Sequence, residues 1–97
     1  MQVKGVKREV VNVDVEPEEL VYGLASVIGV QSLFKDVRDE YAVLEEKEDK
    51  YYIVFYNNTC YHGTPHYEEY SRNELTKEEY TVAIGLKEMM KIIKSGK

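Results

Sequence analysis

Three side chains that could do chemistry lie close together in the sequence: the thiol of Cys60 and the imidazoles of His62 and His66. Zinc in proteins favours four nitrogen, sulfur or oxygen donors, so these three, with a nearby glutamate or a water molecule, could bind Zn²⁺. Their C-x-H-x3-H spacing corresponds to no zinc-finger pattern, and Gly63-Thr64-Pro65 between the histidines is typical of a turn. A zinc site is therefore one hypothesis for this segment, and a solvated loop is the alternative.

The same segment would also allow a thiol enzyme, with Cys60 as the nucleophile and His62 or His66 as its general base. Such a site needs an electropositive environment that favours the thiolate, and the neighbouring Glu68 and Glu69 oppose this. The chain contains no glycine-rich phosphate loop, no H-E-x-x-H motif and no G-x-S-x-G motif. The sequence thus predicts no catalytic residue and no cofactor, and it favours a protein that is not an enzyme.

Tyrosine is the other unusual feature, because the chain has nine tyrosines beside two phenylalanines and no tryptophan. Most of them come after Tyr41 in the sequence. This part of the chain also contains two segments with strand-like alternation that are apolar on both faces. Tyrosine offers a large amphipathic contact area, so a sheet face left bare by helices would suit a protein interface. The predicted partner-binding residues are Tyr41, Val43, Tyr52, Val54 and Tyr56. The alternatives are a strand covered on both faces and a platform for single-stranded bases, which an acidic surface disfavours.

A strand followed by a helix is predicted to begin the domain. Apolar and polar residues alternate at the end of the segment 3–15, which predicts a half-buried strand. A proline and two acids then favour a helix over 17–28, because proline suits the first helical position and acids suit the positive end of the helix dipole. Gly29 is the natural end of this helix. A short second helix is predicted within 30–39.

An antiparallel hairpin is predicted in the middle of the chain. The strands are expected over 40–45 and 50–56, joined by a charged turn over 46–49. Two further segments, 60–62 and 66–72, lie on either side of the turn that contains the proline. The sequence allows each of them to be a short strand, with loop structure for one or both as the alternative.

A long amphipathic helix is predicted at the C-terminal end. Thr76 and Glu79 form a capping box that begins it, and Gly96 ends it. Apolar residues recur along this helix at the spacing of one face, at Val82, Leu86, Met89 and Ile93.

This order of elements predicts a single α+β domain over residues 1–97. We expect a two-layer sandwich, in which an antiparallel sheet of three to four strands packs against an N-terminal β-α unit and the long C-terminal helix. The helices would cover one face of the sheet and leave the other to a partner.

The formal net charge of -5 is unevenly distributed, with lysine and arginine at both ends and an acidic middle. An acidic surface repels phosphate groups, so nucleic acid is not an expected partner. A third functional hypothesis is an acidic mimic of nucleic acid that inhibits a DNA-binding protein.

No segment offers the roughly 20 apolar residues of a membrane-spanning helix, so no membrane role is expected. A single cysteine cannot form an intrachain disulfide, which indicates the cytoplasm.

The segment Lys7-Arg8-Glu9-Val10-Val11-Asn12-Val13-Asp14-Val15-Glu16-Pro17-Glu18-Glu19-Leu20 resembles the beginning of small uncharacterised proteins encoded by phages and prophages of Gram-positive bacteria. The later Leu75-Thr76-Lys77-Glu78-Glu79-Tyr80 has a similar character. The resemblance implies a mobile-element origin and carries over no catalytic residue. Small acidic proteins of this kind often bind host or phage proteins. The leading hypothesis is therefore a small protein-binding or regulatory module that self-associates, as a homodimer, through the tyrosine-rich sheet face.

Overall fold

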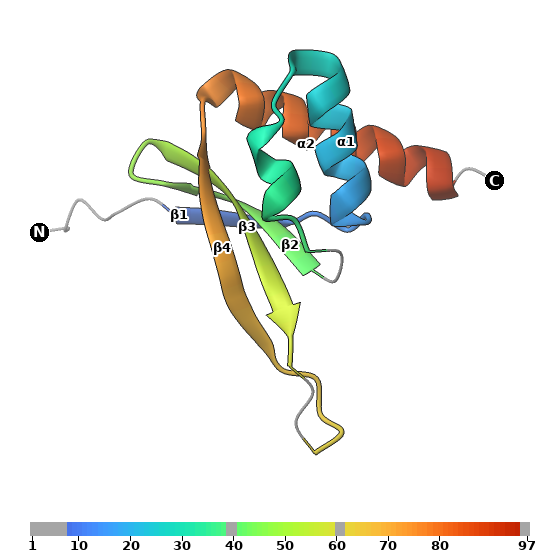
Figure 1. The fold of residues 1–97 in the computed structure, drawn as a ribbon. Helices are drawn as coiled ribbons and strands as arrows, with labels where there is room; N and C mark the ends of the chain where they lie inside the picture. Colours follow the sequence, from blue (N-terminus) through green and yellow to red (C-terminus); the bar gives the residue numbers. More distant parts are fainter. Residues whose placement is uncertain (1–7, 39–40, 60–61, 96–97) are drawn as a thin grey trace, which may run out of the picture.

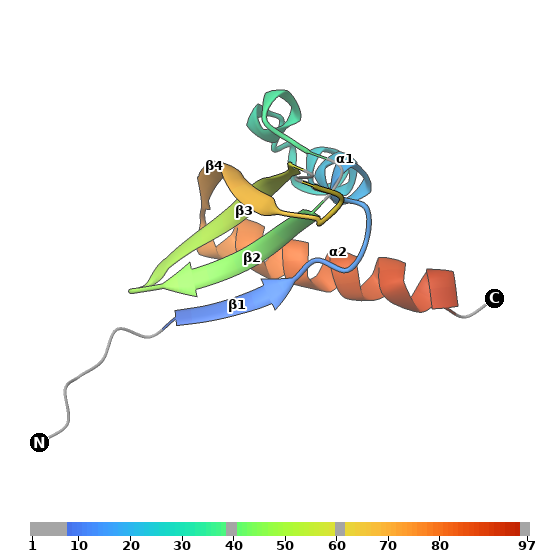
Figure 2. The same ribbon diagram turned by 90° about the horizontal axis from the view of Figure 1, so that it is seen from below.

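The computed structural model describes residues 8–38, 41–59 and 62–95, and these residues form a four-stranded sheet and two α-helices. In chain order the elements are β1 (Arg8–Asn12), α1 (Pro17–Ile28), the 3₁₀ helix η1 (Ser32–Lys35), β2 (Tyr41–Lys47), β3 (Lys50–Asn58), β4 (Tyr67–Leu75) and α2 (Lys77–Ser95). The strands lie in the order β1-β2-β3-β4, each antiparallel to the next. Both helices pack on one side of the sheet (Figures 1 and 2), which confirms the predicted α+β architecture.

The first helix has the bounds that its sequence predicts. Pro17 occupies its first turn, where the missing N–H costs no helical hydrogen bond, and two acids follow in the same turn. Gly29 ends the helix in the left-handed conformation, with φ of 76°, and donates its N–H to the carbonyl oxygen of Ala25 at 3.0 Å. Glycine tolerates this conformation because it lacks a Cβ.

The β2–β3 hairpin has a shorter turn than the sequence suggested. Only Glu48 and Asp49 form it, with φ of 53° and 65°, and both strands extend to the turn. Two-residue turns with positive φ match the right-handed twist of the flanking strands, which explains this tight connection.

The core lies between the helices and the sheet face that they cover. Its fully buried members from the helices and strands include Leu20, Leu24, Leu44, Ile53, Phe55 and Ala83. The two helices approach closely at Gly23, where an added Cβ would lie 3.2 Å from Leu86 Cδ1 and 3.3 Å from Met90 Cε. A larger side chain at this position would push α1 away from α2, because packed interiors hold little free volume.

The β3–β4 hairpin projects beyond the helix layer as an arm (Figure 1). β4 begins near the predicted strand at 66–72 and continues to Leu75, with a register irregularity opposite Phe55 and Tyr56. His62 lies in the turn at the tip, where the sequence suggested a strand over 60–62; residues 60 and 61 themselves lie outside the described residues. Of the predicted turn Gly63-Thr64-Pro65, Gly63 forms a turn together with His62.

The segment between η1 and β2 contacts the base of this arm through the side chain of Arg38. The guanidinium carbon of Arg38 lies 3.6 Å from the centroid of the Tyr70 ring, within the range of a cation–π interaction. The Arg38 Nε also donates to Asn57 Oδ1 at 3.1 Å. Arg38 thus links the two strands of the arm to the chain that precedes β2.

The second helix begins with the predicted capping box. The Thr76 N–H donates to Glu79 Oε1 at 2.8 Å, and the Glu79 N–H donates to Thr76 Oγ1 at 3.1 Å. The buried face of the helix differs from the apolar face that its sequence suggests. Its buried residues are Tyr80, Ala83 and Lys87, whereas Met89 and Ile93 are exposed.

The buried Tyr80 should make the stability of the fold sensitive to alkaline pH. Burial, with the nearby Glu46 and Glu9, raises the pKa of Tyr80 above its usual value of about 10. The Tyr80 hydroxyl therefore ionises at a lower pH in the unfolded chain than in the folded protein. As a result, the free energy of unfolding should fall as the pH rises from about 10 to the pKa of Tyr80 in the folded protein. Denaturant titrations across this pH range should show the fall in the native protein and a weaker one in Tyr80→Phe. Tyr22→Phe, at an exposed position, is the control and should behave as the native protein.

Candidate functional site

The five residues predicted to bind a partner lie together on the sheet face that carries no helix, which we call the open face. Cross-strand pairing places Tyr41 beside Tyr56 and Val43 beside Val54. Tyr52 follows the same alternation along β3. Figure 2 shows the strands of this face with α2 running behind them.

The valines at the centre of the open face are buried although no helix covers them. Val43 and Val54 expose 3% and 0% of their surface, and the neighbouring Tyr52 and Tyr56 are half-buried. Arg72 is the cross-strand neighbour of Val54 on β4. The long side chains of this face therefore shield Val43 and Val54 from solvent. The surface offered to a partner includes tyrosine and arginine, together with Val10 of β1, which is paired with Glu45 and is 45% exposed.

Three tyrosine rings pack against one another at the end of the open face nearest the arm, and we call them the tyrosine cluster. The Tyr41 ring centroid lies 5.2 Å from that of Tyr56 and 5.2 Å from that of Tyr67, with the ring planes tilted by 52° and 42°. The Tyr41 hydroxyl donates to Asn12 Oδ1 at 2.7 Å. Tilted rings in mutual contact are a stable aromatic packing, and they do not form a flat platform on which successive bases could stack.

A charged network crosses the open face beside this cluster. Arg72 donates from Nη1 to Glu45 Oε1 at 3.0 Å, from Nη2 to Glu69 Oε1 at 3.0 Å and from Nε to Glu69 Oε2 at 3.2 Å. The two hydrogen bonds with Glu69, and to a smaller extent the one with Glu45, raise the pKa of the Arg72 guanidinium, while its partial burial lowers it. Its guanidinium also lies 5.3 Å from the centroid of the Tyr52 ring. Arg72 is thus held in one orientation by two carboxylates and one aromatic ring.

The sequence did not reveal the pairing of Glu45 with Arg72, because these two residues lie 27 positions apart in the chain. The Glu45 side chain exposes only 2% of its surface, whereas the sequence suggests a solvated acid at a strand end. One signal was present: strand alternation places Glu45 on the same face as Val43. A charged residue beside Val43 is expected either on a solvent-exposed face or in a buried ion pair. Only the position of Arg72 in the folded protein distinguishes these two environments.

The segment proposed for metal or thiol chemistry gives no assembled site among the described residues. Cys60 lies outside them, and His62 and His66 are both exposed. His66 Nε2 lies 3.5 Å from Glu68 Oε2. Within ranges 8–38, 41–59 and 62–95, no group of three histidine, cysteine or acidic side chains could hold a metal ion. The metal and thiol hypotheses therefore stay predictions from the sequence.

The chain matches no protein-family model, no curated protein and no solved structure. Neither of the two described helices is long and apolar enough to cross a membrane. A functional assignment therefore has to come from the geometry of the open face.

Proposed function

We propose that this chain is a small protein-binding or regulatory module, and that its partner protein binds the open face at the tyrosine cluster and Arg72. The observation that carries the proposal is a sheet face that neither described α-helix covers, and on which tyrosine and arginine are partly exposed. Tyr67 exposes 46% of its surface, and the Arg72 side chain exposes 34%. Tyrosine and arginine are enriched among the residues that contribute most to protein interfaces.

The charges of the open face support a protein partner over mimicry of nucleic acid. Its acidic residues Glu45, Glu69 and Glu74 are matched in number by the basic residues Lys47, Lys50 and Arg72. A mimic of nucleic acid needs a surplus of negative charge, and the described side chains of this face have none. The cytoplasm remains the proposed compartment because the chain has one cysteine, and a mobile-element origin remains a proposal from the sequence resemblance.

Site-specific cross-linking in cells that naturally produce the protein tests this function. A photoreactive amino acid in place of Tyr67 should cross-link to a partner protein, because this position lies within the proposed contact. The same amino acid in place of Tyr22, which is exposed on α1 at the opposite layer, is the matched control and should give no such product. With the partner identified, Tyr67→Ala should raise the dissociation constant about tenfold or more. Equal cross-linking from both positions, or an unchanged dissociation constant, would contradict the proposal.

A further inference from the structure

The sheet has two edge strands, and β4 is the longer of them (Figure 1). It spans nine residues against the five of β1, and it pairs only with β3. Every second residue of an antiparallel edge strand directs its N–H and C=O groups away from the sheet. Within ranges 8–38, 41–59 and 62–95, no backbone hydrogen bond reaches these outward groups of β4. An extended peptide chain supplies acceptors and donors at the matching spacing, so this edge can accept a further strand.

The outward groups include those of Arg72 and Glu74. The residues that flank the tight β2–β3 turn hydrogen-bond to each other, so Lys50 faces β2. Alternation along β3 then makes Ile53 face β4, and its cross-strand partner Asn73 faces back toward β3. Arg72 and Glu74, on either side of Asn73, therefore direct their N–H and C=O groups away from the sheet.

The side chains of Arg72 and Glu74 belong to the open face, because their cross-strand partners Val54 and Tyr52 lie there. Tyr67, near the other end of β4, belongs to the tyrosine cluster. A strand added to β4 would therefore extend the open face and lie alongside the residues to which the proposed function assigns the partner.

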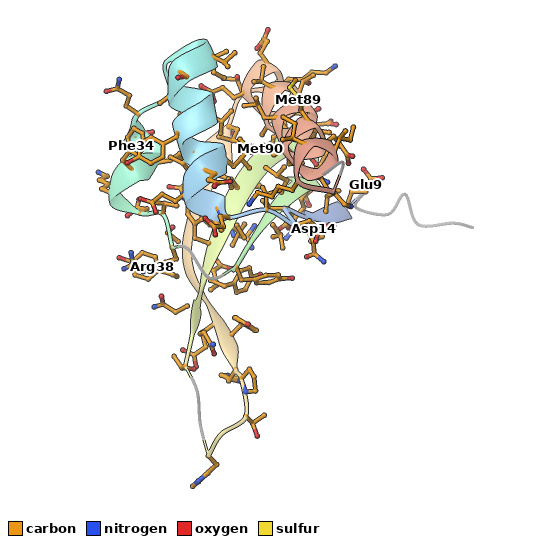
Figure 3. All side chains as sticks on the ribbon, turned by 90° about the vertical axis from the view of Figure 1, so that its right-hand side faces the viewer. Glu9, Asp14, Phe34, Arg38, Met89 and Met90 are labelled. Carbon is orange, nitrogen blue, oxygen red and sulfur yellow. The ribbon has the colours of Figure 1, made fainter. Side chains whose placement is uncertain are left out.

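Two aromatic contacts hold the arm part of β4 in position. The Arg38 guanidinium lies 3.6 Å from the centroid of the Tyr70 ring, and Figure 3 shows Arg38 near the base of the arm. The Tyr67 ring packs on Tyr41 of β2 at a centroid distance of 5.2 Å. An edge that is already held in place loses less conformational entropy when a partner binds, which favours strand addition here.

The charge of β4 favours a basic segment as the occupant of this edge over a second copy of the chain. β4 carries Glu68, Glu69 and Glu74 and a single basic residue, Arg72. Two β4 strands side by side would double this excess of acids, and like charges on neighbouring strands are destabilising. The side chains of Glu69 and Glu74 expose 42% and 60% of their surface. Lysine or arginine side chains of an added strand could therefore reach both carboxylates.

We propose that the partner protein adds an extended segment to the outer edge of β4, and that basic side chains of this segment lie beside Glu69 and Glu74. The inference rests on the proposed function, because it names the part of the partner that binds the open face. Main-chain hydrogen bonds supply the affinity, and the alternate side chains of the segment supply the specificity.

An NMR titration with a defined probe tests strand addition. The probe is a short blocked peptide in which lysine and valine alternate, and the control peptide has glutamate in place of lysine. The amide protons of Arg72 and Glu74 should shift downfield as they gain carbonyl acceptors, whereas that of Asn73, which faces β3, should shift less. No such shift with the lysine peptide, or equal affinity for both peptides, would overturn the proposal. The same shifts in response to protein concentration alone would also overturn it, because they would identify a second copy.

Two variants of Glu74 separate the main chain from the side chain. Glu74→Pro removes an outward N–H, which an edge strand tolerates, and should weaken binding of the lysine peptide about tenfold. Glu74→Ala keeps the N–H and loses only an exposed carboxylate, so it should weaken binding about twofold. Circular dichroism checks that both variants fold. Equal effects of the two folded variants would show that the main chain is not used and would overturn the proposal.

The partner protein that is cross-linked at Tyr67 separates this inference from the proposed function. If Tyr67→Ala weakens binding of that partner and Glu74→Pro does not, the partner binds the open face without strand addition, and only this inference fails. If Tyr67 cross-links to no partner, the proposed function fails, whatever the peptide does.

Discussion

Replacement of Phe55 by alanine is expected to lower the free energy of unfolding by about 3 to 5 kcal/mol. Phe55 is the largest side chain that is fully buried, and it lies on β3 in the core between sheet and helices. Removing its ring loses the transfer free energy of the buried atoms and leaves a cavity that the surrounding backbone cannot fully close. Since small domains are stable by only about 5 to 15 kcal/mol, this change should remove a large share of the free energy of unfolding.

Urea denaturation followed by far-ultraviolet circular dichroism measures this loss, and Phe34→Ala is its matched control. Phe34 is the other phenylalanine of the chain; it is exposed on η1 and contacts the Tyr22 ring at a centroid distance of 5.1 Å. Its truncation should cost clearly less than that of Phe55, because the Phe34 side chain is already 38% exposed and lies outside the buried core. Equal losses at the two phenylalanines would contradict the described position of Phe55.

Arg72→Met is expected to lower the free energy of unfolding by about 2 kcal/mol. The substitution keeps most of the aliphatic volume but removes the guanidinium that faces the buried Glu45 carboxylate. Breaking a fully buried ion pair costs roughly 3 to 5 kcal/mol. The smaller value applies here because the Arg72 side chain is 34% exposed, so water can reach the carboxylate once the guanidinium is absent.

Three further variants, measured by the same denaturation, separate the ion pair from general effects of lost charge. Lys50→Met removes the ion pair with Glu74, in which both side chains are 60% exposed at 4.0 Å, and should change stability little. Arg72→Lys keeps the charge but cannot donate to both carboxylates in the same fork geometry, so it should fall between the native protein and Arg72→Met. The double variant Glu45→Leu/Arg72→Met should recover most of the loss, because no buried charge remains. A double variant as unstable as Arg72→Met would contradict this explanation.

The local elements could be predicted from the sequence because their signals come from residues a few positions apart. Pro17 and Gly29 determine where α1 begins and ends, and the capping box from Thr76 to Glu79 begins α2. Strand alternation placed Val43 and Val54 on a common face, and the structure pairs them there. Each of these patterns involves residues within one turn of a helix or neighbouring residues of a strand. It can therefore be recognised without knowledge of any long-range contact.

The sequence by itself determined the α+β class, the bounds of α1 and the group of side chains that share the open face. Only the tertiary structure decided that tyrosines and Arg72 would shield Val43 and Val54, since Arg72 and Glu45 lie on different strands. It also decided that Met89 and Ile93 would be exposed, because the C-terminal end of α2 extends past the sheet (Figure 1). Periodicity shows which side chains share a face, but whether that face is buried depends on how far the opposite layer extends.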